Sequence, residues 1–135
     1  PVALLGQVDE LEELVHALKL FDYVNEAGGH ATVPPVAAPQ TEWSTPIDAF
    51  ESAYKHEQHV TALINNLYDL ATEEKDHATK VMLQWFITEQ VEEEASVSLV
   101  VDQLKLIGED RAALLVLDQQ LATRAAPAQP ANSQQ

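Results

Sequence analysis

Long stretches without helix-breaking residues constrain the fold of this chain more than any other feature. The sequence has four Gly in 135 residues, and no Gly or Pro lies between Ile47 and Ile107. A fold of many short strands needs frequent turns, so these stretches predict long helices and an all-α fold. Hydrophobic residues make up 46% of the chain, which is enough to bury a core and argues against a disordered acidic protein.

Local capping signals place four helices along the chain. Gly28 and Gly29 end the first helix, as glycine commonly does at a helix C-terminus. Thr45 is a predicted N-cap with Pro46 at the first helical position, and Asp76 is a predicted N-cap for the next helix. The short turn between the second and third helices predicts that they pack antiparallel. The predicted helical ranges are about 2–27, 46–73, 77–107 and 109–124.

The first two predicted helices are joined by a long connection. Residues 28–45 contain two Gly and three Pro and have no helical period. A connection of this length inside a compact domain usually serves a purpose, and a crossover along a helix bundle is one such purpose. We expect a helical domain over residues 1–124 and a disordered tail, rich in Ala, Gln and Pro, over residues 125–135.

The charge of the chain excludes several classes of protein. Its 22 acidic and 7 basic residues give a formal net charge of −15, which argues against binding to nucleic acid or to anionic membranes. No cysteine is present, so a disulfide framework and a thiolate metal site are excluded. No apolar run reaches the length of a membrane span, and no signal peptide is recognised, so the predicted location is the cytoplasm.

Carboxylates interrupt the apolar faces of three predicted helices. Glu57 in the second helix and Glu93 in the third each lie mid-helix on a face that is otherwise mostly apolar. Glu13 and His16 lie one turn apart on the first helix. Burying an ionised carboxylate costs several kcal/mol unless a cation pairs with it. Because no Lys or Arg adjoins these acids on their faces, an external cation is the expected partner.

The types of ligand narrow the choice of metal. Carboxylate oxygens with a single imidazole suit Fe(II), Mn(II) or Zn(II). The Glu-x-x-His spacing of Glu13 and His16, with further Glu residues from facing helices, is the layout of di-iron carboxylate sites in helix bundles. Each motif by itself is also typical of a solvated helix surface, above all the acidic run at residues 89–94.

Five segments of the chain resemble bacterial non-haem ferritins. The resemblance extends in order from about Glu12 to Arg124. The segments that carry it are Phe21–Glu26, Tyr54–Gln58, Leu83–Phe86, Glu89–Glu94 and Lys105–Gly108.

The resemblance implies a ferritin-like fold and a function. The fold is an up-down-down-up four-helix bundle with a long crossover loop and a short fifth helix. Such subunits assemble, usually as about 24, into a shell that stores iron inside the cell as ferric oxide. They bind Fe(II) and oxidise it to Fe(III) with O2 or peroxide at a dinuclear ferroxidase centre. A haem-binding type is not expected, because the only methionine, Met82, does not lie where a haem ligand at a subunit interface is expected.

The resemblance also implies a role for individual residues. Glu13 matches the glutamate that bridges two irons, and His16 matches the histidine ligand of the first iron. Glu57 and Glu93 match ligands of the second iron, and Gln90 matches a glutamine beside the centre. The acids of a third iron site match Glu12, Glu89 and Glu92, with Glu93 shared.

The N-terminal part of the chain departs from the family pattern. The family has a complete first helix and the first half of a second before the Glu-x-x-His motif, whereas here only Pro1–Glu12 precede it. The glutamate that the first helix gives to the first iron site has no equivalent. We therefore expect a shortened chain, with ferroxidase activity if the missing helix is supplied or dispensable. The alternative is a truncated, non-catalytic shell subunit that binds cations through its acidic residues.

Overall fold

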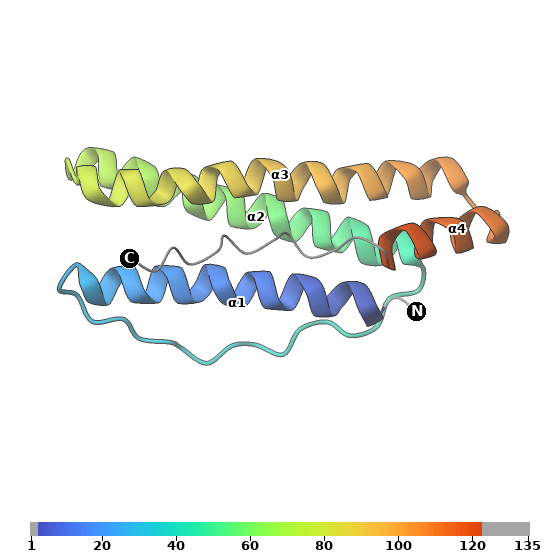
Figure 1. The fold of residues 1–135 in the computed structure, drawn as a ribbon, viewed down its shortest axis with the longest axis horizontal. Helices are drawn as coiled ribbons and strands as arrows, with labels where there is room; N and C mark the ends of the chain where they lie inside the picture. The colour runs from blue at the N-terminus through green and yellow to red at the C-terminus, as the bar shows by residue number, and fades with distance from the viewer. Residues whose placement is uncertain (1–2, 123–135) are drawn as a thin grey trace, which may run out of the picture. The chain divides into compact units, whose positions relative to one another are not determined.

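The protein is built from four helices in a computed structural model that describes the backbone of residues 3–122 and the side chains of residues 13–122 (Figure 1). The helices are α1 (Ala3–Glu26), α2 (Pro46–Glu73), α3 (His77–Ile107) and α4 (Arg111–Ala122). No strand occurs within residues 3–122, so the predicted all-α class is confirmed. The predicted tail at residues 125–135 lies outside the described residues.

The contacts divide the chain into two compact units. One unit contains α1 and α4, which contact each other, and the other unit is the hairpin formed by α2 and α3. None of the described helices is long and apolar enough to cross a membrane.

Helix capping defines the two ends of the hairpin. The Thr45 hydroxyl accepts a hydrogen bond from the Asp48 amide at 3.2 Å, and Pro46 occupies the first turn of α2. Asp76 caps α3 by accepting from the Thr79 amide at 3.0 Å. The Thr79 hydroxyl also donates to Asp76, and this bond holds the pKa of the Asp76 carboxyl below its ordinary range. These caps give α2 and α3 the bounds 46–73 and 77–107, the same as the ranges expected from the sequence.

The two helices of the hairpin lie side by side and antiparallel (Figure 1). Lys105, near the end of α3, is 3.1 Å from Glu51, near the start of α2. Lys80, near the start of α3, lies over the ring of Tyr68, near the end of α2, at 5.2 Å. The apolar side chains buried in the hairpin are Ile64, Ala71, Leu83, Phe86, Val100, Val101 and Leu104.

The helices of the other unit also begin and end at local signals. Gly28 has φ of 84°, and the amides of Gly28 and Gly29 donate to Asn25 O and Val24 O, which is the Schellman pattern that ends α1. Asp110 accepts from the amides of Ala112 and Ala113 at 2.9 and 3.2 Å. Because Asp110 is the cap, α4 begins at residue 111 rather than at the expected residue 109.

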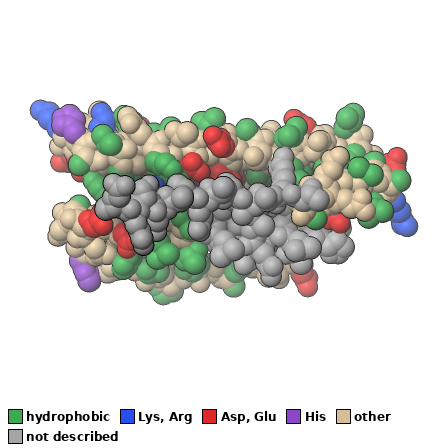
Figure 2. Space-filling view, viewed as in Figure 1, with side chains coloured by type: hydrophobic (Ala, Val, Ile, Leu, Met, Phe, Trp, Pro, Cys, Tyr) green, Lys and Arg blue, Asp and Glu red, His purple; other side chains and the backbone are tan. Residues whose placement is uncertain are grey.

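Apolar side chains remain exposed on one face of α2. Leu63, Leu67 and Leu70 follow one another at helical spacing and are 48%, 45% and 52% exposed. Figure 2 shows hydrophobic side chains among acidic ones on the visible surface of the molecule. A continuous stripe of this kind is typical of a helix face that meets a further helix.

The turn between α2 and α3 contains a residue in the left-handed region. Lys75 has φ of 58°, and the amides of Lys75 and Asp76 donate to Thr72 O and Ala71 O. This is again the Schellman pattern, with lysine at the position where glycine is preferred. Lys75→Gly is expected to raise the free energy of unfolding by about 0.5–1 kcal/mol, because glycine has no Cβ to clash at positive φ.

Urea denaturation followed by circular dichroism measures this change. Glu74→Gly is the matched control, because Glu74 has an ordinary helical φ of −77°. That control should lower the stability instead. An equal effect of the two glycines would contradict the assignment of strain to Lys75.

Candidate metal centre

The middle of the α2–α3 hairpin contains a polar contact within an apolar core. Glu57 lies half-buried midway along α2, at the position where its carboxylate interrupts the apolar face. Gln90 lies opposite on α3 and is only 4% exposed. Since a buried amide must be paired to avoid a penalty of about 1–3 kcal/mol, its partners define the local geometry.

The Gln90 amide nitrogen faces α2 and has three acceptors. Gln90 Nε2 lies 3.2 Å from the Glu57 main-chain oxygen, 3.2 Å from Glu57 Oε2 and 3.2 Å from Thr61 Oγ1. The amide therefore connects α3 to the carboxylate of α2 and holds one of its two oxygens by a hydrogen bond. The other carboxylate oxygen, Oε1, takes no part in this contact.

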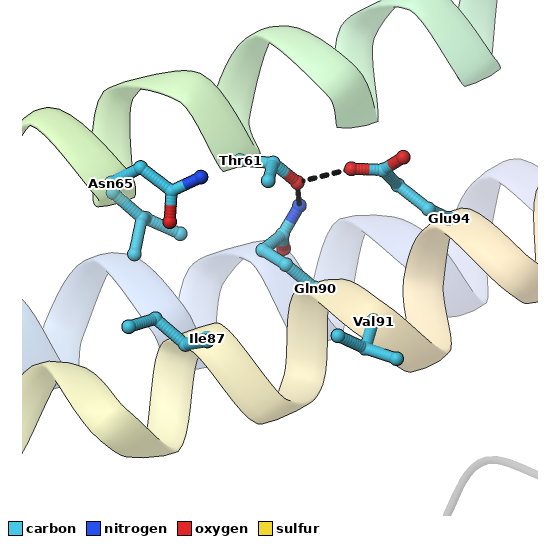
Figure 3. A pocket seen from close by; sticks show the side chains of 7 residues that line it. Thr61, Asn65, Ile87, Gln90, Val91 and Glu94 are labelled. Atoms are coloured by element: carbon cyan, nitrogen blue, oxygen red, sulfur yellow. Dashed lines mark hydrogen bonds between the residues drawn. The ribbon is translucent and has the colours of Figure 1, made fainter.

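A second hydrogen bond continues this network to a second carboxylate. The Thr61 hydroxyl donates to Glu94 Oε1 at 2.6 Å, so Thr61 lies between Gln90 and Glu94 (Figure 3). The same residues line an open pocket of about 320 Å³ between the two helices. Its lining residues are Thr61, Ile64, Asn65, Ile87, Gln90, Val91 and Glu94.

The predicted metal ligands on α3 differ in their exposure. Glu89 and Glu93 are half-buried, whereas Glu92 is exposed. Glu93 follows Gln90 by three residues, so both lie on neighbouring turns of one helix face. The structure therefore brings Glu57 and Gln90 into contact and places Glu89 and Glu93 on the same helix as Gln90.

The remaining predicted ligands lie on α1. Glu13 is exposed, and His16 is half-buried one helical turn further along. Glu12 belongs to the same helix, but its side chain lies outside the described residues. Within α1, the spacing of Glu13 and His16 allows one metal ion to bind both side chains.

Sequence reasoning missed the roles of Thr61 and Glu94. Thr61 is not among the residues singled out in the sequence, and Glu94 belongs to the acidic run at residues 89–94 that is typical of a solvated helix surface. Each follows a predicted site residue by four positions, since Thr61 follows Glu57 and Glu94 follows Gln90. That helical spacing was the available signal, but the pairing across two helices could not be predicted from it.

Comparisons with known proteins agree with this architecture. The profile of the ferritin-like domain matches residues 5–107. A bacterial non-heme ferritin from Staphylococcus saprophyticus is 43% identical over 113 residues, which cover 84% of this chain and 68% of the relative. A bacterial non-heme ferritin from Bacteroides fragilis is 42% identical over 113 residues, which cover 84% of this chain and 70% of that relative.

Solved structures match the chain as well. The open pore ferritin from the hyperthermophilic archaeon Archaeoglobus fulgidus superposes with a TM-score of 0.88 at 48% identity, over 90% of this chain and 75% of the archaeal one. The ferritin of Chlorobium tepidum superposes with a TM-score of 0.70 at 41% identity, over 84% of this chain and 70% of that one. The chain is thus similar to ferritins in both sequence and fold.

Removing the buried amide tests the energetic role of this contact. Gln90→Met keeps the side-chain length but leaves the Glu57 carboxylate and Thr61 without the donor from α3. The free energy of unfolding is expected to fall by about 1–2 kcal/mol, the usual effect of removing one partner of a buried hydrogen bond. Gln84→Met is the control, because Gln84 is exposed on the same helix. Equal urea midpoints for the two variants would contradict this role of Gln90.

Proposed function

Because this chain belongs to the ferritin family, we propose that it binds Fe(II), oxidises it to Fe(III) with O2 or peroxide, and stores it as ferric oxide in a protein shell in the cytoplasm. The observation that carries the proposal is the contact between Glu57 and Gln90 inside the hairpin. It lies within the segment that matches the ferritin-like domain, and it holds an acidic side chain mid-helix in an otherwise apolar core.

The proposed ligands divide into two groups by helix. Glu57 of α2 and Glu93 of α3 bind the second iron. Glu13 and His16 of α1 bind the first iron, with the Glu13 carboxylate bridging the two. Gln90 remains beside the centre as a hydrogen-bond donor to Glu57 Oε2.

The ligand set explains why oxidation of Fe(II) is favourable at this centre. Carboxylates are hard anionic ligands, so they stabilise Fe(III) more strongly than Fe(II) and lower the reduction potential of the bound iron. In the proposed reaction two ferrous ions each lose one electron. O2 takes both electrons with two protons and leaves as peroxide, or peroxide takes them with two protons and leaves as two waters. Holding both ions at one bridging carboxylate allows the two electrons to pass to one oxidant.

The third iron site and the storage step involve the other acids. Glu12, Glu89 and Glu92, together with Glu93, form the proposed third site. A formal net charge of −15 attracts cations toward the protein, which assists both delivery of Fe(II) and retention of Fe(III).

The exposed apolar stripe on α2 supports self-association. Leu63, Leu67 and Leu70 are about half exposed, and such a stripe gains stability when another helix covers it. Together with the resemblance to ferritins, this supports our proposal that the subunits assemble into a shell of about 24.

Fe(II) oxidation by the protein tests the proposed activity. Aerobic addition of Fe(II) to the full chain should produce the ferric oxo absorbance faster than buffer alone. Glu57→Ala and Glu93→Ala should each slow the initial rate at least about tenfold, because each removes a metal ligand. Glu73→Ala is the control, since it removes an exposed carboxylate at the end of α2.

Two results would contradict the proposed activity. One is a wild-type rate equal to that of buffer, and the other is an equal rate in the control and the two ligand variants. If the wild type binds Fe(II) without oxidising it, the non-catalytic cation-binding subunit is the better description.

Particle mass tests the proposed assembly. Light scattering of the purified chain should give a mass near that of 24 subunits of 14.9 kDa. Leu67→Glu is expected to reduce the particle mass, because it places a charge within the exposed apolar stripe. A monomeric wild type would contradict self-association.

A further inference from the structure

We propose that Thr61 and Glu94 are positioning residues for the carboxylate of Glu57, and that they act through the amide of Gln90. The inference rests on the proposed function, in which Glu57 binds Fe(II). All four side chains belong to the α2–α3 hairpin, and hydrogen bonds connect each to the next.

The Thr61 hydroxyl lies between an acceptor and a donor. Its oxygen is 2.6 Å from Glu94 Oε1 and 3.2 Å from Gln90 Nε2. A carboxylate oxygen accepts, so the single hydroxyl hydrogen points to Glu94 and a lone pair remains for Gln90. Bonds from a hydroxyl to a carboxylate are about twice as strong as neutral ones. Glu94 therefore determines the direction of the Thr61 hydroxyl.

The direction of that hydroxyl determines the orientation of the Gln90 amide. The nitrogen and oxygen ends of an amide have nearly the same shape, so hydrogen bonding decides which end faces a neighbour. Because the hydroxyl hydrogen is directed to Glu94, Thr61 Oγ1 can act toward Gln90 only as a hydrogen-bond acceptor. It therefore pairs with the nitrogen end of the Gln90 amide. The two Glu57 oxygens near Gln90 are acceptors as well. Three acceptors thus hold the nitrogen end toward α2.

The amide orientation in turn directs the Glu57 carboxylate. Gln90 Nε2 donates to Glu57 Oε2, and this bond holds the carboxylate in one orientation. Without the acceptor on Glu94, the Thr61 hydroxyl is free to turn and donate to a reversed amide. A reversed amide places its oxygen against Glu57 Oε2, where two acceptors repel each other and the carboxylate loses its fixed direction.

The two positioning residues are suited to substitution. Thr61 and Glu94 are half-buried and line the open pocket, where Val91 is 68% exposed beside them (Figure 3). Changes at these positions therefore remove little apolar packing, in contrast to a substitution of Gln90 itself.

The test compares variants that remove a hydrogen bond with variants that keep it. Thr61→Val and Glu94→Met remove the donor and the acceptor, whereas Thr61→Ser and Glu94→Gln retain them. Thr72→Val and Glu73→Met are matched controls on α2, where the Thr72 hydroxyl donates to Tyr68 O in its own helix. Co(II) is the probe, titrated anaerobically into the full chain and followed by its visible absorption.

Loss of positioning should weaken metal binding by a defined factor. Thr61→Val and Glu94→Met are each expected to bind Co(II) about tenfold more weakly, the lower end of the effect of residues that orient metal ligands. In the Fe(II) assay the same variants should raise KM by a similar factor and leave kcat near the wild-type value. The retaining variants and both controls should bind Co(II) as the wild type does.

Two outcomes would overturn the inference. One is a Co(II) affinity equal to that of the wild type in Thr61→Val or in Glu94→Met, measured on a variant whose circular dichroism shows that its helices are intact. The other is an equal loss in Thr61→Ser and Thr61→Val, which would assign the effect to packing. A wild type that binds Co(II) but does not accelerate Fe(II) oxidation would contradict the ferroxidase proposal alone, since the Co(II) comparison still decides the roles of Thr61 and Glu94.

Discussion

The arrangement of the hairpin depends on one constraint, which is that a buried amide must find hydrogen-bond partners. Gln90 is only 4% exposed, and its nitrogen reaches three oxygen atoms of α2. The apolar residues around it hold α2 and α3 together by contacts that have no preferred direction. The amide adds direction, since Glu57 and Thr61 must lie opposite Gln90 for the bonds to form.

This constraint links the stability of the hairpin to its chemistry. The hydrogen bond from Gln90 Nε2 to Glu57 pairs the buried amide. The same bond orients the Glu57 carboxylate, which we propose as an iron ligand. Glu94 and Thr61 extend the network to the open pocket. A carboxylate held in this way before a metal arrives loses less conformational entropy when it binds.

Much of the fold could be predicted because its signals are local. Thr45 and Asp76 cap α2 and α3 within one turn, and Gly28 ends α1 at positive φ, as expected. Glu57 and Glu93 were predicted as site residues because each interrupts an apolar helix face, and both are half-buried. Gln90 was identified only through the resemblance to ferritins, and its contact with Glu57 required the structure. The hydrogen bond between Thr61 and Glu94 joins residues 33 positions apart, for which the sequence has no periodic signal.

The sequence by itself determined the bounds of α2 and α3, the all-α class and the family. Capping, glycine conformation and helical periodicity act over a few residues, so they can be recognised along the chain. Only the tertiary structure decided which polar atoms face one another inside the hairpin. A hydrogen bond between two helices forms only when its two atoms lie within a fraction of an ångström of the ideal distance. That distance depends on the register and rotation of each helix, which are set by the packing of side chains from both helices at once.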